Sequence, residues 1–396
     1  MRHFDQAVNS SKLHLSTGNQ VILLRNGAEY FPALEAAIDN AQHEIYLQTY
    51  IFEADKIGLR ISAALKRAAI RGVTTCVLLD GFGCKNIPPK FVQEMQEAGV
   101  SLLFYRQKIS PWTFKRNRLR RLHSKLTVID GSIGFVGGIN IIDDFNTPHQ
   151  HAPRIDYAVS VRGPLLKLMH ASAYKLWQHI SWLHFRQPHI SKSRGRIHTK
   201  PAGSMRAAFV IRDNVLHRND IEEAYLEAII NAQTEIVIAN SYFLPGLRFR
   251  RALIEAQQRG VRVILLLQAR VEYRLLDYAS HALYSAFLRQ GIEIYEYHKS
   301  FMHSKVAVID HHWVTVGSSN IDPFSLLLAR EANVIICDDQ FGAELRADIE
   351  CTITKGSRKI RPERWKRERI IKRFFYWLVY GLLRFVLGIL GYPDKR

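Results

Sequence analysis

One stretch of sequence occurs twice, and it constrains the fold more than any other feature of the chain. Residues 123–140 read HSKLTVIDGSIGFVGGIN, and residues 303–320 read HSKVAVIDHHWVTVGSSN, an offset of 303 − 123 = 180. The apolar, β-branched run after each Lys predicts a buried strand, a turn and a second strand. A chain that carries this unit twice is expected to fold as two similar halves.

Each copy places a titratable group beside a fixed charge. His123 and Lys125 are two residues apart, as are His303 and Lys305. On a strand, side chains at i and i+2 share a face, so an imidazole and an ammonium should project together from each copy. A single H-x-K triplet arises often by chance and predicts only an exposed His next to a solvated Lys. The two copies also agree in the downstream Gly and Asn, which favours one site built from both.

The pattern HxKxxxxD…GxxN, complete in both copies, resembles the signature of the phospholipase D superfamily. The segments GSSNIDP at 317–323 and REANV at 330–334 resemble more narrowly the bacterial cardiolipin synthases of the B type. The resemblance covers about residue 19 to the mid-350s. It implies an α/β fold of two similar phospholipase D-like domains, each a mixed β-sheet flanked by helices, with pseudo-two-fold symmetry and one shared active site. The catalytic residues that it implies are His123, Lys125, Asp130, His303, Lys305 and Asp310.

Other residues of the site follow from the same resemblance. In the family, an Asp or Glu after the GxxN segment orients each His, and the matching positions here are Asp156 and Glu331. Asn140 and Asn320 are expected to donate hydrogen bonds to phosphoryl oxygens. Asp130 lies five residues after its Lys, so on a regular strand it points to the opposite face, where it would fix the Asp-Gly turn. The two motif Asp residues are therefore weaker candidates for the chemistry than the orienting acids.

These residue types suit a two-step displacement at a phosphodiester. One imidazole attacks phosphorus and becomes a phosphohistidine, while the other protonates the leaving alcohol and then activates the incoming nucleophile. The resemblance favours His123 as the nucleophile. With Lys and Asn donors available, we expect no metal and no cofactor. Adjacent His311 and His312 come nearest to a metal-ligand pair, but exposed surface histidines explain them better.

The rest of the chain repeats in the same order. AIDNAQHEIYLQ at 37–48 is echoed by AIINAQTEIVIA at 228–239, and EAGVSLLFY at 97–105 by RQGIEIYEY at 289–297. Alternating strands and helices predict a parallel or mixed sheet with helices on both faces. The predicted organisation is a first domain over 1–184, a linker over 185–206, a second domain over 207–354 and a membrane-associating tail over 355–396. The first half carries about twelve extra residues within the basic, aromatic loop 106–121, either a solvated loop or a rim that contacts lipid head groups.

Charge indicates a polyanionic partner. Lys and Arg exceed Asp and Glu by 55 − 36 = 19, which suits nucleic acid or an anionic membrane. Two motifs in one chain and the apolar, aromatic run at 374–392 favour lipid, so we expect phosphatidylglycerol and the membrane surface as partners, with no nucleic acid and no protein partner. The four cysteines form no metal-ligand spacing and indicate reduced thiols.

The tail leaves three arrangements open: a helix lying in the membrane interface, a spanning or re-entrant segment, and a helix packed on the globular body. In the first, Arg369, Arg373, Tyr376, Tyr380 and Arg384 form one helical stripe that would face phosphates. The expected location is the cytoplasmic side of the bacterial inner membrane, with peripheral or monotopic attachment. The function that the family resemblance implies is that of a cardiolipin synthase. The alternatives are a phospholipase D-type hydrolase or other phosphatidyltransferase, a nuclease of the superfamily, and a non-enzymatic membrane-binding protein.

Overall fold

The computed structural model describes residues 13–106, 120–147, 151–184, 197–213, 216–270, 274–323, 325, 329–366 and 370–389. Most of the extra loop (107–119) and most of the linker (185–196) lie outside these residues, so the interpretations placed on them stay predictions. Strand β10 begins at Met205, two residues inside the segment predicted as linker.

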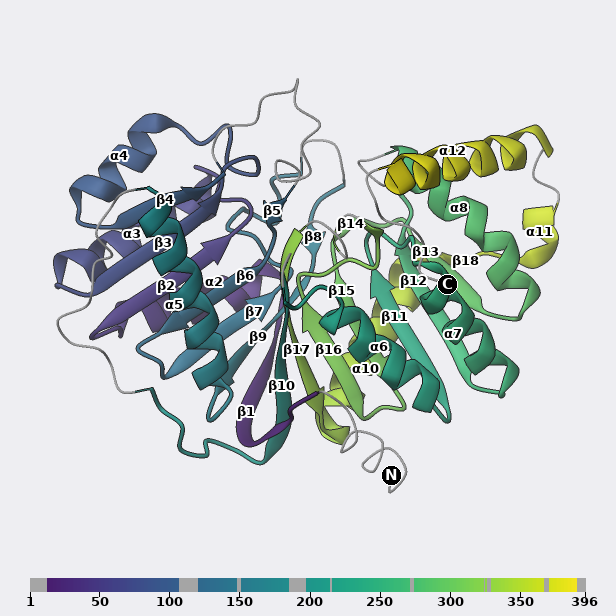
Figure 1. Cartoon of the computed structure of the whole chain (residues 1–396), viewed down its shortest axis with the longest axis horizontal. Coiled ribbons are helices and arrows are strands. Elements are labelled where there is room, and N and C mark those ends of the chain that lie inside the picture. Colours follow the sequence, from purple (N-terminus) through teal and green to yellow (C-terminus); the bar gives the residue numbers. More distant parts are fainter. Residues whose placement is uncertain are drawn as a thin grey trace.

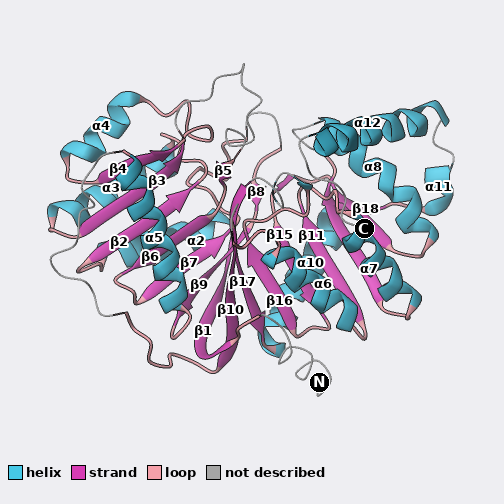
Figure 2. Cartoon of the chain, in the orientation of Figure 1, coloured by secondary structure: helices cyan, strands magenta, loops and turns pink. Residues whose placement is uncertain are grey.

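One continuous mixed sheet runs through both halves (Figures 1 and 2). The strands of the first half are β1 (Ser16–Arg25), β2 (Glu44–Thr49), β3 (Thr74–Asp80), β4 (Ser101–Tyr105), β6 (Lys125–Ile129), β7 (Ile133–Gly137) and β9 (Tyr157–Arg162). Those of the second half are β10 (Met205–Arg212), β11 (Glu235–Asn240), β12 (Arg262–Gln268), β13 (Glu293–Tyr297), β15 (Lys305–Ile309), β16 (Trp313–Gly317), β17 (Ala329–Cys337) and β18 (Ser357–Lys359).

The strand order shows the duplication. Outward from the centre, the first half runs β1-β9-β7-β6-β2-β3-β4, and the second runs β10-β17-β16-β15-β11-β12-β13 with β18 at the edge. Antiparallel pairing of β1 with β10 joins the halves. The prediction of two similar α/β halves related by pseudo-two-fold symmetry is confirmed, and the two sheets are fused into one.

Helices cover both faces of the sheet (Figure 1). They are α2 (Asn26–Asp39), α3 (Lys56–Ile70), α4 (Pro89–Glu97), α5 (Leu166–Leu183), α6 (Asp220–Asn231), α7 (Leu247–Gln258), α8 (Arg274–Arg289) and α10 (Asp339–Gly356). Strand alternation divides the core: Ile45 and Leu47 of β2 pack with α2 and α3, whereas Tyr46 packs with α5. Because both faces are buried, these strands are nearly continuous apolar runs.

Two short strand pairs connect the halves at the sequence motifs. β5 (Arg121–Leu122) pairs with β17, and β8 (Arg154–Ile155) pairs with β14 (Phe301–Met302). Each pair places the residue that precedes a motif His next to the opposite half. The two motif copies are thereby drawn to the same place in the fold.

Part of the predicted tail packs on the globular body, which is one of the three arrangements that the sequence left open. Helix α10 runs through the boundary expected at residue 354, and the β18 strand that follows pairs with β13 at the edge of the sheet. Beyond it come α11 (Pro362–Lys366) and α12 (Ile370–Ile389). The prediction that one stripe of this helix faces phosphates is wrong for Tyr376 and Tyr380, because both side chains are buried against the body. Across the described ranges, no helix combines the length and apolarity needed to cross a bilayer.

Candidate active site

Each motif His and Lys lies at the N-terminal end of a strand of the sheet. Lys125 opens β6 and Lys305 opens β15, and both side chains are buried. Lys125 Nζ donates to the carbonyl oxygen of His123 at 2.6 Å, and Lys305 Nζ donates to that of His303. The i, i+2 spacing therefore brings each ammonium to the backbone carbonyl of its own motif His.

The histidines are held by the opposite half of the chain. His123 Nδ1 lies 2.9 Å from Glu331 Oε1, and the His123 backbone N–H donates to Arg330 at 3.0 Å. His303 Nδ1 lies 2.7 Å from Asp156 Oδ2, and its backbone N–H donates to Ile155. Since a carboxylate only accepts, Nδ1 carries the proton in each ring and Nε2 is left with its lone pair.

Electrostatic coupling shows that the two copies form one cluster. Burial lowers the pKa of His123, and Lys305 of the other half contributes to this lowering. The pKa of His303 is lowered well below its usual value, first by burial and then by the charges of Lys305 and Lys125. Both imidazoles are therefore neutral at pH 7 while the site is free of ligand, and the neutral ring is the form that can attack phosphorus.

The buried charges nearby are strongly perturbed. Burial lowers the pKa of Lys125 to about 7 and that of Lys305 to about 8. Burial also raises the pKa of Asp156 to about 6, although the lysines oppose this. Such a cluster of desolvated cations suits an anionic ligand, because a bound phosphodiester would restore the charged form of both lysines.

The two motif asparagines are fixed through their amide oxygens. Asn140 Oδ1 accepts from the backbone N–H of Ile51 at 3.1 Å, and Asn320 Oδ1 accepts from Ser241 Oγ at 3.0 Å. Within the described part of the chain, no hydrogen bond is recorded from either Nδ2. This geometry leaves the amide N–H groups as candidate donors to a phosphoryl oxygen.

The motif aspartates lie away from this cluster. Asp130 accepts from the backbone N–H groups of Gln42, His43 and Glu44, each at 2.8 Å. Asp310 does the same with residues 233–235 and also accepts from Thr234 Oγ1. Each carboxylate ties the turn after one strand to the start of the neighbouring strand, at the end of the sheet opposite the histidines. Each Asp directly follows the strand that its motif Lys begins, so the length of the strand accounts for this position.

Sequence reasoning missed one contact to an orienting acid. Ser318 Oγ donates to Glu331 Oε2 at 2.5 Å and accepts from the Ala332 N–H at 3.0 Å. The first copy has Gly138 at this position, where an added Cβ would lie 2.3 Å from Asp156 Oδ1. The only signal was the difference between GGIN and GSSN, which nothing in the sequence connects to a carboxylate 13 residues away.

The halves also differ beside the lysines. In the first half, Tyr50 makes an edge-to-face contact with His123, with ring centroids 4.9 Å apart, and Lys125 Nζ lies 5.5 Å from the same ring. The equivalent residue of the second half is Ser241, whose Oγ accepts from Lys305 Nζ at 3.3 Å. The duplicated motif is thus embedded in two different environments.

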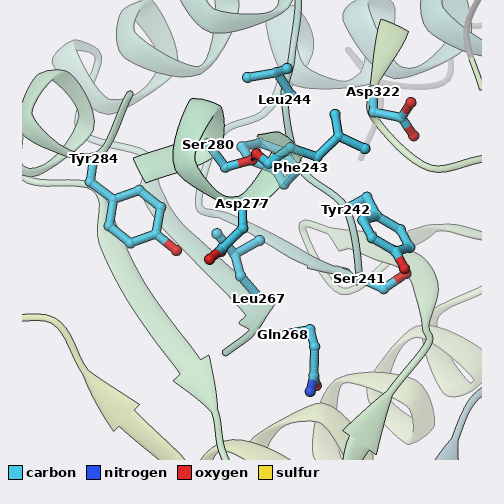
Figure 3. A pocket seen from close by; sticks show the side chains of 11 residues that line it. Ser241, Tyr242, Phe243, Leu244, Leu267, Gln268, Asp277, Ser280, Tyr284 and Asp322 are labelled. Carbon is cyan, nitrogen blue, oxygen red and sulfur yellow. Dashed lines mark hydrogen bonds between the residues drawn. The ribbon is translucent and has the colours of Figure 1, made fainter. Parts of the chain in front are cut away.

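A pocket adjoins the second copy (Figure 3). The segment after β11 contributes Ser241 and Tyr242, and α8 contributes Asp277, Ser280 and Tyr284. Ser241 contacts Lys305, so the pocket borders the cluster of motif residues. Several of its polar groups are already engaged: Ser280 donates to the Leu276 carbonyl oxygen, and Asp277 pairs with His281.

His311 and His312 lie on the turn after Asp310, outside this cluster. His312 pairs with Asp339 at 2.6 Å, and His311 lies 3.7 Å from Glu235. In the portion of the chain that is described, no three His, Cys, Asp or Glu residues are grouped so that they could hold a metal ion.

Comparison with known proteins gives a consistent set of relatives. The family described as "Cardiolipin synthase, PLD-like domain" matches residues 34–147 and 225–352. Cardiolipin synthase B of Shigella flexneri is 38% identical over 352 residues, which cover 87% of this chain and 82% of that protein. The Escherichia coli K12 protein of the same name is 37% identical with the same coverage. The probable cardiolipin synthase YwiE of Bacillus subtilis is 28% identical, covering 88% of this chain and 69% of that protein.

Solved structures show the same fold at low identity. Phosphatidylserine synthase from Haemophilus influenzae has a TM-score of 0.68 at 13% identity and covers 98% of this chain and 97% of its own. Polyphosphate kinase from Porphyromonas gingivalis has a TM-score of 0.57 at 15% identity, over 87% of this chain and 49% of its own. At these identities the likeness concerns the fold alone.

Proposed function

The chain belongs to the cardiolipin synthase family with phospholipase D-like domains, and from this premise we propose that it transfers a phosphatidyl group between two phosphatidylglycerol molecules, giving cardiolipin and glycerol. The observation that carries the proposal is the crossed pairing, in which each half supplies a His and the acid that orients the other His. The pairing supports a site with two imidazoles, which a displacement through a covalent intermediate requires.

In the first step, Nε2 of His123 attacks the phosphorus of the donor lipid. His303 must carry a proton on Nε2 as well as on Nδ1 for this step, and binding of the anionic phosphodiester favours that imidazolium. The P–N bond then forms while the P–O bond to the head-group glycerol breaks, and His303 gives its Nε2 proton to the leaving glycerol oxygen. Glu331 stabilises the positive charge that develops on the His123 ring through the Nδ1 hydrogen bond. The products are a phosphatidyl-histidine and free glycerol.

In the second step, His303 acts as a base. It takes the proton from a glycerol hydroxyl of the second phosphatidylglycerol, whose oxygen attacks phosphorus as the P–N bond breaks. Asp156 keeps a proton on Nδ1 of His303, so that Nε2 is the nitrogen that gives the proton in the first step and takes it in the second. At the end both imidazoles have returned to their starting forms.

The two lysines and two asparagines stabilise charge on the phosphoryl oxygens. Lys125 and Lys305 are buried cations with lowered pKa values, so binding of the phosphodiester anion favours their protonated form. Such preorganised donors in a water-poor site stabilise the transition state more than they would in water.

The nearest competing activity is hydrolysis. It shares the phosphohistidine and differs only in whether water or an alcohol reaches phosphorus, so a transferase must exclude water and hold the acceptor. Beside Lys305, the Ser241 hydroxyl replaces the Tyr50 ring of the first half, which makes the second half the more polar side of the site. The predicted lid, loop 106–121, lies mostly outside the described residues and carries no part of this argument.

A lipid assay tests the proposal. Purified protein is incubated with two phosphatidylglycerols of different acyl composition, and the lipids and released alcohol are identified by mass spectrometry. We expect cardiolipin with mixed acyl pairs and one glycerol released per cardiolipin. Phosphatidic acid as the dominant product would establish a hydrolase, a different released alcohol would identify another donor, and DNA cleavage without lipid products would establish a nuclease.

The nucleophile and the location are parts of the same proposal. Rapid acid-free quenching with a donor labelled in its phosphate should trap the label on His123; label on His303 would exchange the two roles. The enzyme is placed on the cytoplasmic surface of the bacterial inner membrane as a peripheral or monotopic protein, which fractionation of cells in high and low salt would test.

A further inference from the structure

Exposed apolar side chains gather at one edge of the sheet. Strands β2, β3, β11 and β12 end at this edge and β6 and β15 begin there, so it also holds the motif histidines. We call it the motif edge. A patch of exposed apolar surface on a folded protein indicates a partner or a membrane, and here the patch borders the site.

Helix α12 carries the larger part of this surface. Its inner face, Tyr376, Val379 and Tyr380, is buried in the core of the second half. Its outer face consists of Phe374, Leu378, Leu382 and Phe385, which are 68%, 59%, 60% and 66% exposed. Their spacing of four, four and three residues places them on one side of the helix. The helix is therefore apolar on both faces, although only one face is covered by protein.

The position of α12 is fixed by contacts to helices that start at the motif edge. Tyr376 stacks on Tyr278 and His281 of α8, and Arg250 of α7 lies 5.7 Å from the Tyr380 ring. Both α7 and α8 follow strands that end at this edge. In Figure 1, α12 lies at the top of the molecule, on the same side as β5, β8 and β14.

An imidazolium strengthens this docking of α12 on the body. His281 lies between Asp277, 3.3 Å away, and Glu296, 3.2 Å away, and stacks on the rings of Trp365 and Tyr376. Burial opposes the charge, but these carboxylates raise the pKa of His281 to about 10. The helix is thus held by a charged, ring-stacked cluster and presents its outer face in a fixed direction.

The first half has a smaller apolar surface at the same edge. Helix α5 ends with Trp182, which is 73% exposed, and Leu183. The next residue, His184, lies with Nε2 3.2 Å from the carbonyl oxygen of Phe104, next to the end of β4. Trp182 and Leu183 therefore lie at the motif edge on the first half, and α12 lies at the same edge on the second half.

The opposite edge of the sheet has no such concentration among the described residues. Ile70 and Ile230 are exposed there, at the ends of α3 and α6, just before β3 and β11 begin. They are single side chains on separate helices. The asymmetry between the two edges argues for a partner that approaches the motif edge.

We propose that the outer face of α12 together with Trp182 and Leu183 forms a two-sided docking surface for an anionic bilayer, which holds the motif edge against the lipid. This inference rests on the proposed function and specifies how the enzyme meets its substrate surface. Between residues 355 and 373 the chain has ten Lys or Arg against two Glu, and its net charge is +19. Such charge attracts an anionic lipid surface, whereas it opposes the approach of a second copy.

Two sets of charge-matched variants test the surface. One carries Leu378→Glu with Phe385→Glu on α12, alone or with Trp182→Glu; the control carries Ile70→Glu with Ile230→Glu. In sedimentation with phosphatidylglycerol vesicles, the α12 pair should bind about 100-fold more weakly than the parent, and adding Trp182→Glu should weaken binding about tenfold further. Each change replaces an apolar side chain that would be buried in the bilayer. The control pair makes the same charge change and should bind like the parent.

A second measurement uses the unmodified protein. Vesicles that contain bromine-labelled acyl chains should quench its tryptophan fluorescence, and Trp182→Phe and Trp377→Phe should each remove part of the quenching, since Trp377 is also exposed on α12. Unchanged quenching in both variants, or equal loss of binding in the α12 and control pairs, would overturn the proposal. A shift from dimer to monomer in the α12 pair with vesicle binding retained would overturn it in favour of a self-association surface.

These readouts do not depend on turnover. If the protein binds vesicles through this surface but makes no cardiolipin, the proposed function fails and the docking surface stands. If cardiolipin forms and the α12 pair loses neither binding nor activity on vesicles, the docking surface fails alone. Turnover of the α12 pair on detergent-dispersed lipid should equal that of the parent, because no altered side chain belongs to the site.

Discussion

Replacing the motif aspartates should destabilise the protein and leave its chemistry intact. The Asp130 carboxylate accepts three backbone N–H groups at 2.8 Å. Water can reach donors at this edge after substitution, so each bond contributes about 1 kcal/mol net. Residue 130 also has φ of 51°, a region that costs Ala about 1–2 kcal/mol but that Asn tolerates. Asp130→Ala should then cost about 4–5 kcal/mol, and Asp130→Asn, which keeps one acceptor oxygen, about 1–2 kcal/mol.

These costs convert to measurable shifts in Tm. An unfolding entropy of about 2 cal/mol/K per residue gives about 0.8 kcal/mol/K for the whole chain, so Asp130→Ala should lower Tm by about 5–6 °C. Asp310, with equivalent bonds, is the matched site, and the double variant should be nearly additive because the two sites are far apart.

The assay pairs calorimetry with turnover at 20 °C. Each variant should keep its turnover within about twofold of the parent. A loss of about 100-fold in Asp130→Asn with an unchanged Tm would refute the reasoning and place the carboxylate in the chemistry.

Three further predictions follow from the crossed site. His123→Ala and His303→Ala should each abolish turnover, and substantial activity in either would contradict a shared site. Glu331→Gln should impair His123, and Asp156→Asn should impair His303, each lowering kcat by about 10³–10⁴-fold because the orienting hydrogen bond to Nδ1 is weakened. Nuclear magnetic resonance of the ring nitrogens should show the change at the His in the half opposite to the substituted acid. A change at the His in the same half would contradict the crossing. The lowered pKa values of the motif lysines, about 7 and about 8, predict that kcat/KM falls as pH rises through this range, because the free site loses its positive charges. In kcat the fall should move to higher pH, since bound phosphodiester raises both pKa values; a profile flat to pH 10 would contradict this.

Much of the fold was predictable because its strands, helices and duplication follow from apolar runs and repeated segments of the sequence. The strand-forming runs and the repeat offsets give the succession of strands and helices along each half, and the family resemblance implies the pseudo-two-fold symmetry. The order of the strands within the sheet was not predicted, because it depends on tertiary pairing. The fusion of the two sheets was not predictable, because the β1–β10 contact depends on edge strands whose pairing partner no local pattern specifies. The sequence also did not predict which face of α12 packs on the protein, because a helix with apolar residues on all sides gives no such signal.

For the site, the residue types were predictable and their partners were not. Asp130 follows the last residue of β6 whereas Lys125 is its first, so the length of the strand separates the carboxylate from the lysine. Which acid bonds to which His depends on how the two halves face each other. The sequence is equally compatible with pairing within each half and with pairing between the halves. Asp156 reaches His303, 147 residues away, and Glu331 reaches His123, 208 residues away.

The crossing explains why the duplicated motif is held within one rigid sheet. A half taken alone would contain an imidazole without its orienting carboxylate and a carboxylate buried beside no imidazole. It would also keep a buried lysine whose charge the opposite acid partly balances, since Glu331 raises the pKa of Lys125 against the effect of burial. Each half therefore leaves unpaired buried charge that only the other half satisfies, at a cost of several kcal/mol if the halves separate. The β1–β10 pairing and the short β5–β17 and β8–β14 strands hold this geometry, so the same contacts that assemble the site also stabilise the association of the two halves.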